Sequence, residues 1–195
     1  MTDAGRLQRL LEQIDRLNAE DPNRELVDNV PQPRELAYAA RLTAWVRRLA
    51  PEASDALRIA ARGQHVRRWT IPRSRYPMNR AGYLRWRETL KVFHADTVEG
   101  LMREESYPDD EIRRVRTLMG KRRLGSDPET QTLEDALCLV FLETQFADLR
   151  RKTAEEKMRE IVRKTWGKMS GRARAEALKL PLTDEDKRYL AQAVS

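Results

Sequence analysis

The chain has 195 residues, of which 40% are hydrophobic and 35% are charged, so it is long enough to bury the core of one domain. Basic and acidic residues are interspersed, which is typical of solvated helical surfaces and excludes a disordered polyelectrolyte. The net charge of +7 favours anionic partners.

The only cysteine, Cys138, excludes an internal disulfide and a thiolate zinc site. It lies in an apolar run, which predicts a buried and unreactive thiol. The first residues contain no apolar signal core, and the longest apolar stretch, residues 136–142, is too short to cross a bilayer. We therefore expect a cytoplasmic protein that does not enter the membrane.

Apolar residues recur at three- and four-residue steps along most of the chain, which predicts amphipathic helices. In chain order, the first four expected helices cover residues 7–17, 34–49, 52–69 and 81–103. A fifth begins after Pro108, and a sixth covers residues 128–149. A seventh begins at residues 153–156, and a short last helix begins at residue 183. Two segments between them, residues 21–33 and 71–77, contain several prolines and are expected to be loops.

No alternating strand pattern, internal repeat or long polar linker interrupts this series of helices. We therefore predict an all-α fold, a compact single-domain multi-helix bundle over residues 1–195. Within it, residues 1–30 form a peripheral N-terminal helix and loop, residues 34–180 form the core, and residues 183–195 form a C-terminal helix. The helix over 128–149 is the most apolar and should be central.

Basic residues concentrate in the middle of the chain. Residues 62–91 contain nine arginines and lysines and one glutamate, so their net charge, nine minus one, is +8, against +7 for the whole chain. Aromatic residues are interleaved, and arginine forks match phosphate oxygens while aromatic faces stack on bases. The predicted anion-binding residues are Arg62, Arg73, Arg75, Arg80 and Arg87, and the predicted stacking residues are Trp69, Tyr76 and Tyr83, with Trp86 beside them. The alternative is a solvated face whose arginines pair with carboxylates elsewhere.

The two histidines and one acidic pair are the other candidates for chemistry. His65 and His94 lie on predicted helices, where a buried histidine bonded to the backbone is the plain alternative to a ligand. Glu134 and Asp135 precede the apolar run of a helix that should be buried. Buried carboxylates need a partner, so we expect either an arginine of the basic segment or a metal ion beside them.

Three stretches resemble a known family. They are QHVRRWTIPRSRYPMNRAGYLRWR at residues 64–87, DPETQTLEDALCLVFLE at residues 127–143 and KTWGKMS at residues 164–170. They are similar to the family called domain of unknown function 4202, and the likeness covers most of the chain from the third helix onward.

The helix order more distantly resembles the HD-type metal phosphohydrolases, which are all-α and hold one divalent metal with a His, a His-Asp pair and a distant Asp. The resemblance implies metal ligands at His65, His94 and Asp135. It departs at the pair, because Ala95 follows His94 and Asp96 comes one residue late, a rotation of about 100° on a helix.

Three functions follow from these observations. In a phosphohydrolase, a divalent ion (Mn, Mg, Fe or Zn) would activate water, with Glu134 and Asp135 as catalytic carboxylates and a nucleotide or other anionic small molecule as substrate. In a metal-free binding module, the arginines would bind RNA or a phosphorylated metabolite on their own. In a structural protein, they would form internal ion pairs. The first two require the basic segment, the acid pair and His65 to face one hollow.

Overall fold

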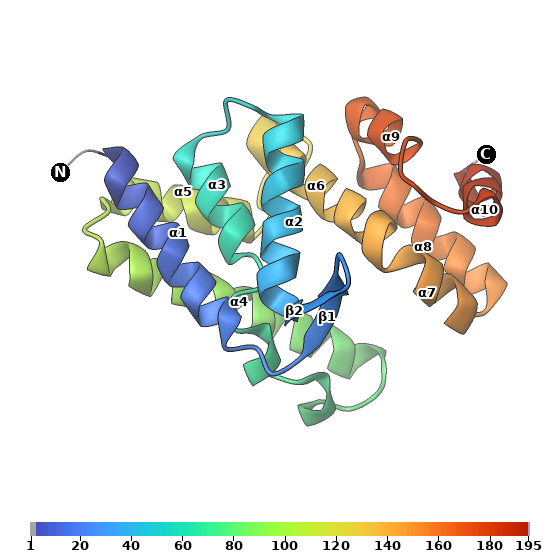
Figure 1. The fold of residues 1–195 in the computed structure, drawn as a ribbon, viewed down its shortest axis with the longest axis horizontal. Helices are drawn as coiled ribbons and strands as arrows, with labels where there is room; N and C mark the ends of the chain where they lie inside the picture. Colours follow the sequence, from blue (N-terminus) through green and yellow to red (C-terminus); the bar gives the residue numbers. More distant parts are fainter. Residues whose placement is uncertain (1–2, 195) are drawn as a thin grey trace.

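The structure, a computed structural model, describes residues 3–194 (Figure 1). In chain order its elements are α1 (Asp3–Ala19), β1 (Arg24–Val27), β2 (Val30–Pro33), α2 (Arg34–Leu49), α3 (Asp55–Gly63), the 3-10 turns η1 (Arg68–Thr70) and η2 (Arg73–Arg75), α4 (Arg80–Glu104), α5 (Asp109–Met119), α6 (Pro128–Thr144), α7 (Phe146–Lys152), α8 (Glu155–Lys168), α9 (Gly171–Ala177) and α10 (Asp184–Val194). Helices make up most of these residues, which confirms the all-α prediction.

The most apolar helix, α6, is central. It packs against α2 on one side and against α8 and α9 on the other (Figure 1). Leu133, Ala136, Leu139 and Val140 are each 0% exposed, as expected for a helix surrounded by others. One hydrophobic cluster runs from Leu7 in α1 to Ala193 in α10, so both ends of the chain pack on the same core.

The N-terminal helices form a layer over α5 and α4. Helix α3 lies between α1, α2 and α5, and it approaches α4 closely at Gly63. A Cβ atom at residue 63 would lie 2.4 Å from a methyl carbon of Val98, so only glycine permits this approach. The close packing fixes the turn that follows α3 against the middle of α4.

The predicted loop at residues 21–33 is wrong, because the structure contains a β-hairpin there. Strands β1 and β2 pair antiparallel with Val27 opposite Val30, and Asp28 and Asn29 form the two-residue turn with φ angles of 50° and 63°. A turn of this type needs two left-handed residues, and Asp and Asn accept that conformation more readily than most. The signal was present in the sequence, but the prolines obscured it.

The predicted third helix is too long at both ends. Ser54 caps α3, with its hydroxyl accepting from the amide of Leu57, and the helix ends at Gly63. Arg67 then adopts φ 53°, a left-handed conformation that no α-helix contains. His65 therefore lies on a turn rather than on a helix, and it does not share a helical face with Arg62 and Trp69.

The predicted sixth helix is divided, and the helix expected to begin at residues 153–156 starts without a side-chain cap. Helix α6 ends at Thr144, and α7 starts at Phe146 after a break at Gln145. Ala154, not Thr153, precedes α8 and makes no side-chain cap. Helix α9, capped by the Ser170 hydroxyl, was not predicted.

None of the helices described in residues 3–194 combines the length and the apolar character needed to cross a bilayer.

The start of α6 depends on Asp127. Its carboxylate accepts from the amides of Glu129 and Thr130, at 3.0 and 3.4 Å, and binds the Arg114 guanidinium of α5. We predict that Asp127→Ala lowers the free energy of unfolding by about 2–4 kcal/mol, since it removes both a helix cap and a charged hydrogen bond. Urea unfolding measures this loss. The exposed first-turn carboxylate Asp110 provides the control, whose replacement by Ala should cost less than about 1 kcal/mol. Equal losses in the two variants would contradict this account of Asp127.

Candidate functional site

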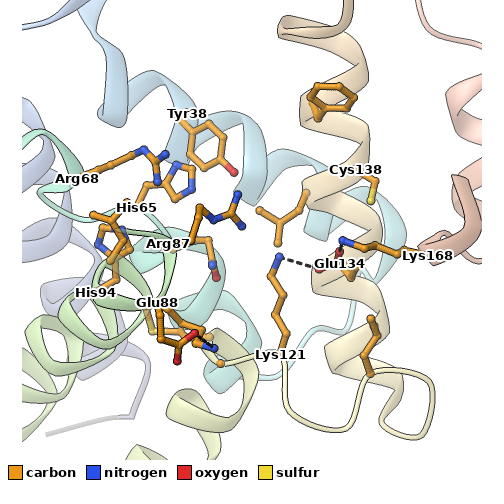
Figure 2. A pocket seen from close by; sticks show the side chains of 18 of the residues that line it. Tyr38, His65, Arg68, Arg87, Glu88, His94, Lys121, Glu134, Cys138 and Lys168 are labelled. Atoms are coloured by element: carbon orange, nitrogen blue, oxygen red, sulfur yellow. Dashed lines mark ion pairs between the residues drawn. The ribbon is translucent and has the colours of Figure 1, made fainter. Parts of the chain in front are cut away.

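A cavity of about 550 Å³ lies where α2, α4, α6 and α8 approach one another. The turn after α3 and the loop between α5 and α6 complete its wall (Figure 2). Five basic side chains line it: Arg68, Arg87, Lys91, Lys121 and Lys168. The carboxylates in the same wall are Glu88 and Glu134, and the two histidines, His65 and His94, lie on the α3–α4 side.

Glu134 holds two lysines from different parts of the chain. Its side chain is 4% exposed, and its two oxygens lie 2.8 Å from the ammonium of Lys121 and 3.2 Å from that of Lys168 (Figure 2). Burial opposes the ionisation of Glu134, but the ammonium groups outweigh it and hold its pKa below the usual value. One carboxylate therefore faces two positive charges, and the pairing leaves a net positive charge at this wall.

Arg87 and Arg68 carry charge on the opposite wall. The guanidinium of Arg87 lies 3.2 Å from the Tyr83 hydroxyl, and no carboxylate in the described part of the chain pairs with it. Arg68 lies over the ring of Trp86 at 4.6 Å, and its nearest carboxylate oxygen, on Glu35, is 3.9 Å away. Lys91 is paired with Glu88 at 2.7 Å.

His94 is buried, and only one of its ring nitrogens is bonded. Its Nδ1 lies 2.8 Å from the carbonyl oxygen of Val66, whereas Nε2 has no hydrogen-bond partner within residues 3–194. Burial lowers the pKa of His94 to about 3, so the ring is neutral. A carbonyl oxygen only accepts, so Nδ1 bears the proton and Nε2 keeps its lone pair.

His65 contacts a buried carboxylate. Its Nδ1 lies 3.3 Å from Oε2 of Glu35, and its ring stacks on Tyr38 with centroids 4.1 Å apart. Burial, together with the charges of Arg68, Arg87 and Lys121, lowers the pKa of His65 well below its usual value. Burial raises the pKa of Glu35 to about 7, against the opposing charge of Arg68.

One family matches the chain. Its description is a domain of unknown function, DUF4202, and the match covers residues 8–190. The chain belongs to the DUF4202 family. No curated protein and no solved structure matches it. The lining of the cavity, from Tyr38 to Lys168, lies within the matched residues, so the cavity is part of the DUF4202 domain.

The structure brings only part of the predicted site together in this DUF4202 chain. His65, His94, Arg87 and Glu134 line the cavity. Asp135, one residue later on α6, points elsewhere, since it accepts from the amide and hydroxyl of Ser170 at 2.8 and 2.5 Å. No three His, Cys, Asp or Glu side chains between residues 3 and 194 are grouped so as to hold one metal ion. His65, His94 and Asp135 thus do not form one ligand group, and a divalent metal stays a prediction, as does the resemblance to HD-type phosphohydrolases.

The arginine partner expected for the acid pair was wrong. Lysines, not arginines of the basic segment, neutralise Glu134, and neutral donors satisfy Asp135, including the amide of Gln131 at 2.9 Å. Asp96 does not approach His94, because it pairs with Arg116 at 2.7 Å.

Most of the predicted anion-binding arginines lie outside the cavity. Arg62 pairs with Asp15 of α1, and Arg73 donates to the carbonyl oxygens of its own loop, of which Tyr76 is one at 2.8 Å. Arg75 and Arg80 are exposed. The predicted stacking residues Trp69, Tyr76 and Tyr83 do not line the cavity, whereas Tyr38 and Phe141 do.

No pattern in the sequence predicted the other cavity residues. Arg68 was counted in the basic segment, but nothing separated it from its neighbours. Lys121 and Lys168 are 47 positions apart in the sequence and meet only because α5 and α8 end beside α6. Glu35 looks like an ordinary acidic residue in the first turn of a helix.

We predict that Glu35 makes stability depend on pH. Its folded pKa is about 7, raised from 4.5, so its contribution is fully present below pH 4.5 and is lost as the pH rises through 7. Between pH 5 and pH 8, the free energy of unfolding of wild type, measured with urea, should therefore fall by up to about 3 kcal/mol relative to that of Glu35→Gln, which has no proton to release. The exposed Glu12→Gln variant is the control, and its difference from wild type should stay nearly constant. A constant difference for Glu35→Gln would contradict the assignment.

Proposed function

We propose that this protein binds a phosphorylated small molecule in the cavity between α4 and α6. The observation that carries the proposal is the charge of the wall. Five basic side chains and two carboxylates line it, and five minus two leaves three unmatched positive charges around about 550 Å³. The histidine rings are neutral and do not change this balance. An anion with two or more negative charges would offset the electrostatic repulsion among these basic side chains.

The basic groups differ in what they offer to a phosphate. Arg87 has no carboxylate partner in the described chain, so its fork is available for two parallel bonds to phosphate oxygens. Lys121 and Lys168 share one carboxylate and retain N–H donors that Glu134 does not occupy. Arg68 is held in place by the Trp86 ring, so less conformational entropy is lost when it binds.

The size and lining of the cavity favour a small molecule over a nucleic-acid strand. A volume of about 550 Å³ lies in the range typical of sites for small ligands. Leu137 and Phe141 of α6 add apolar surface beside the basic groups, which suits the base or sugar of a nucleotide. RNA is the alternative, and it would instead use exposed residues such as Arg75, Arg80 and Arg85.

We predict that Arg87→Gln weakens the binding of AMP and of pyrophosphate by about 10–100-fold, because it removes a charged bidentate contact. Isothermal titration calorimetry on the full chain measures the dissociation constants. Arg80→Gln is the matched control: it removes an exposed arginine from the start of the same helix and should leave both constants unchanged.

The same titrations separate the two ligand classes. If Arg80→Gln weakens binding as much as Arg87→Gln, or if only an RNA oligomer binds with a steep dependence on salt, the surface and not the cavity is the binding site. Absence of binding by AMP, pyrophosphate and inorganic phosphate at low salt would overturn the proposal.

A further inference from the structure

His65 lies at the boundary between two cavities. The first is the basic cavity described above, and the second, of about 530 Å³, lies between α2 and α7, beside β1. Both are lined by His65, Tyr38 and Arg68, whereas Glu35 lines only the second and Lys121 only the first. The imidazole therefore has a carboxylate on one side and the basic wall on the other.

Glu35 is fixed in a position to orient the imidazole. It lies in the first turn of α2, its side chain is 8% exposed, and its amide donates to a carboxylate oxygen of Asp21 at 3.1 Å. Oε2 of Glu35 is 3.3 Å from Nδ1 of His65. Tyr38, one turn later on α2, stacks on the ring at an interplanar angle of 13°. Two residues of one helix thus set both the plane and the direction of the His65 ring.

The position of Glu35 favours one tautomer of His65. Above pH 7, where Glu35 is ionised, its Oε2 lies 3.3 Å from Nδ1 and attracts the proton to that nitrogen, so Nε2 carries the lone pair. The two nitrogens of an imidazole point away from each other across the ring, so Nε2 is directed away from Glu35 and the second cavity. No hydrogen bond to Nε2 of His65 forms within residues 3–194, which leaves this lone pair available to a molecule in the basic cavity.

We propose that His65, oriented by Glu35, is the general base that activates water against a phosphate group held by Arg68, Arg87 and Lys121. The proposal rests on the proposed function, and it adds hydrolysis of a phosphate monoester to binding. Nucleophile activation by a base that a third group orients is a recurring arrangement in enzymes. His65 would be the catalytic residue, and Glu35 would be a positioning residue.

The reaction balances without an added reactant. Nε2 of His65 takes a proton from water, and the water oxygen forms a bond to phosphorus. The phosphorus–oxygen bond to the alcohol breaks, and the alcohol oxygen takes the proton from the His65 imidazolium. The products are the alcohol and inorganic phosphate. The arginines and Lys121 stabilise the negative charge on the phosphoryl oxygens as the bonds change.

The test measures phosphate release by the full chain from p-nitrophenyl phosphate and from the four nucleoside 5′-monophosphates. His65→Gln should lower kcat by about 10²–10⁴-fold, the usual contribution of a general base, with KM within about threefold of wild type. Glu35→Gln should lower kcat by at least about tenfold with KM also retained, because the base loses its orienting carboxylate. Arg80→Gln, outside the cavity, is the control and should match wild type.

A rescue experiment separates chemistry from folding. In His65→Gly, added imidazole should restore part of kcat. If the role of His65 were purely structural, imidazole would not raise the rate of this variant. Thermal unfolding of each variant checks that the fold is retained.

The outcomes distinguish the two proposals. If wild type binds AMP but releases no phosphate from any probe, the proposal that His65 is a general base is wrong, and the proposed binding site is unaffected. If wild type does not bind AMP, both proposals are wrong. A His65→Gln variant with full kcat also overturns the base. So does a rate that requires added Mn²⁺, disappears in His65→Gly and is not rescued by imidazole, since His65 would then be a metal ligand.

Discussion

Electrostatic repulsion among five basic side chains around one half-enclosed cavity is the constraint on which the proposed activity depends. Two carboxylates are too few to neutralise them, and the nearby histidines are neutral. The fold reduces this repulsion by placing two of the charges at helix ends. Lys168 is the last residue of α8, and Lys121 follows the end of α5 by two residues. The partial negative charge at a helix C-terminus favours a cation there, so these positions stabilise the lysines before any anion binds.

The central helix connects this charge arrangement to the fold. Glu134 lies on α6 among fully buried apolar residues, and its pairing with lysines from the α5–α6 loop and from α8 joins three parts of the chain at the wall of the cavity. Removal of the lysines would be costly because the buried carboxylate would be left without a partner. The same contacts that stabilise α6 therefore keep the lysines beside the cavity, and an anion bound there would compete with Glu134 for their N–H groups.

Sequence reasoning worked where a residue's role depends on its neighbours in the chain. The three- and four-residue periodicity predicted α2 at its observed bounds and placed α6 at the centre, since burial of a helix follows from its own apolar pattern. It failed at α3, where close packing of Gly63 on Val98 and the left-handed Arg67 end the helix early. Because of that error, His65 was placed on a helix, whereas it lies on a turn. Sequence reasoning also missed the contact with Glu35, because residues thirty positions apart meet only through tertiary packing.

The basic segment shows the same limit for the site. Three of its nine basic residues, Arg68, Arg87 and Lys91, line the cavity, but charge in a sequence does not reveal the direction of a side chain. Arg62 and Arg73 are occupied by Asp15 and by backbone carbonyls, whereas Arg68 and Arg87 line the cavity. Lysines from two distant segments complete the wall, and no local pattern marked them.

Anomalous diffraction from crystals soaked in tungstate, a heavy oxyanion, tests the central claim most directly. The account predicts one strong site in the cavity, within bonding distance of Arg68, Arg87 and Lys121. Occupancy only on the outer surface, beside Arg75 and Arg80, would contradict it.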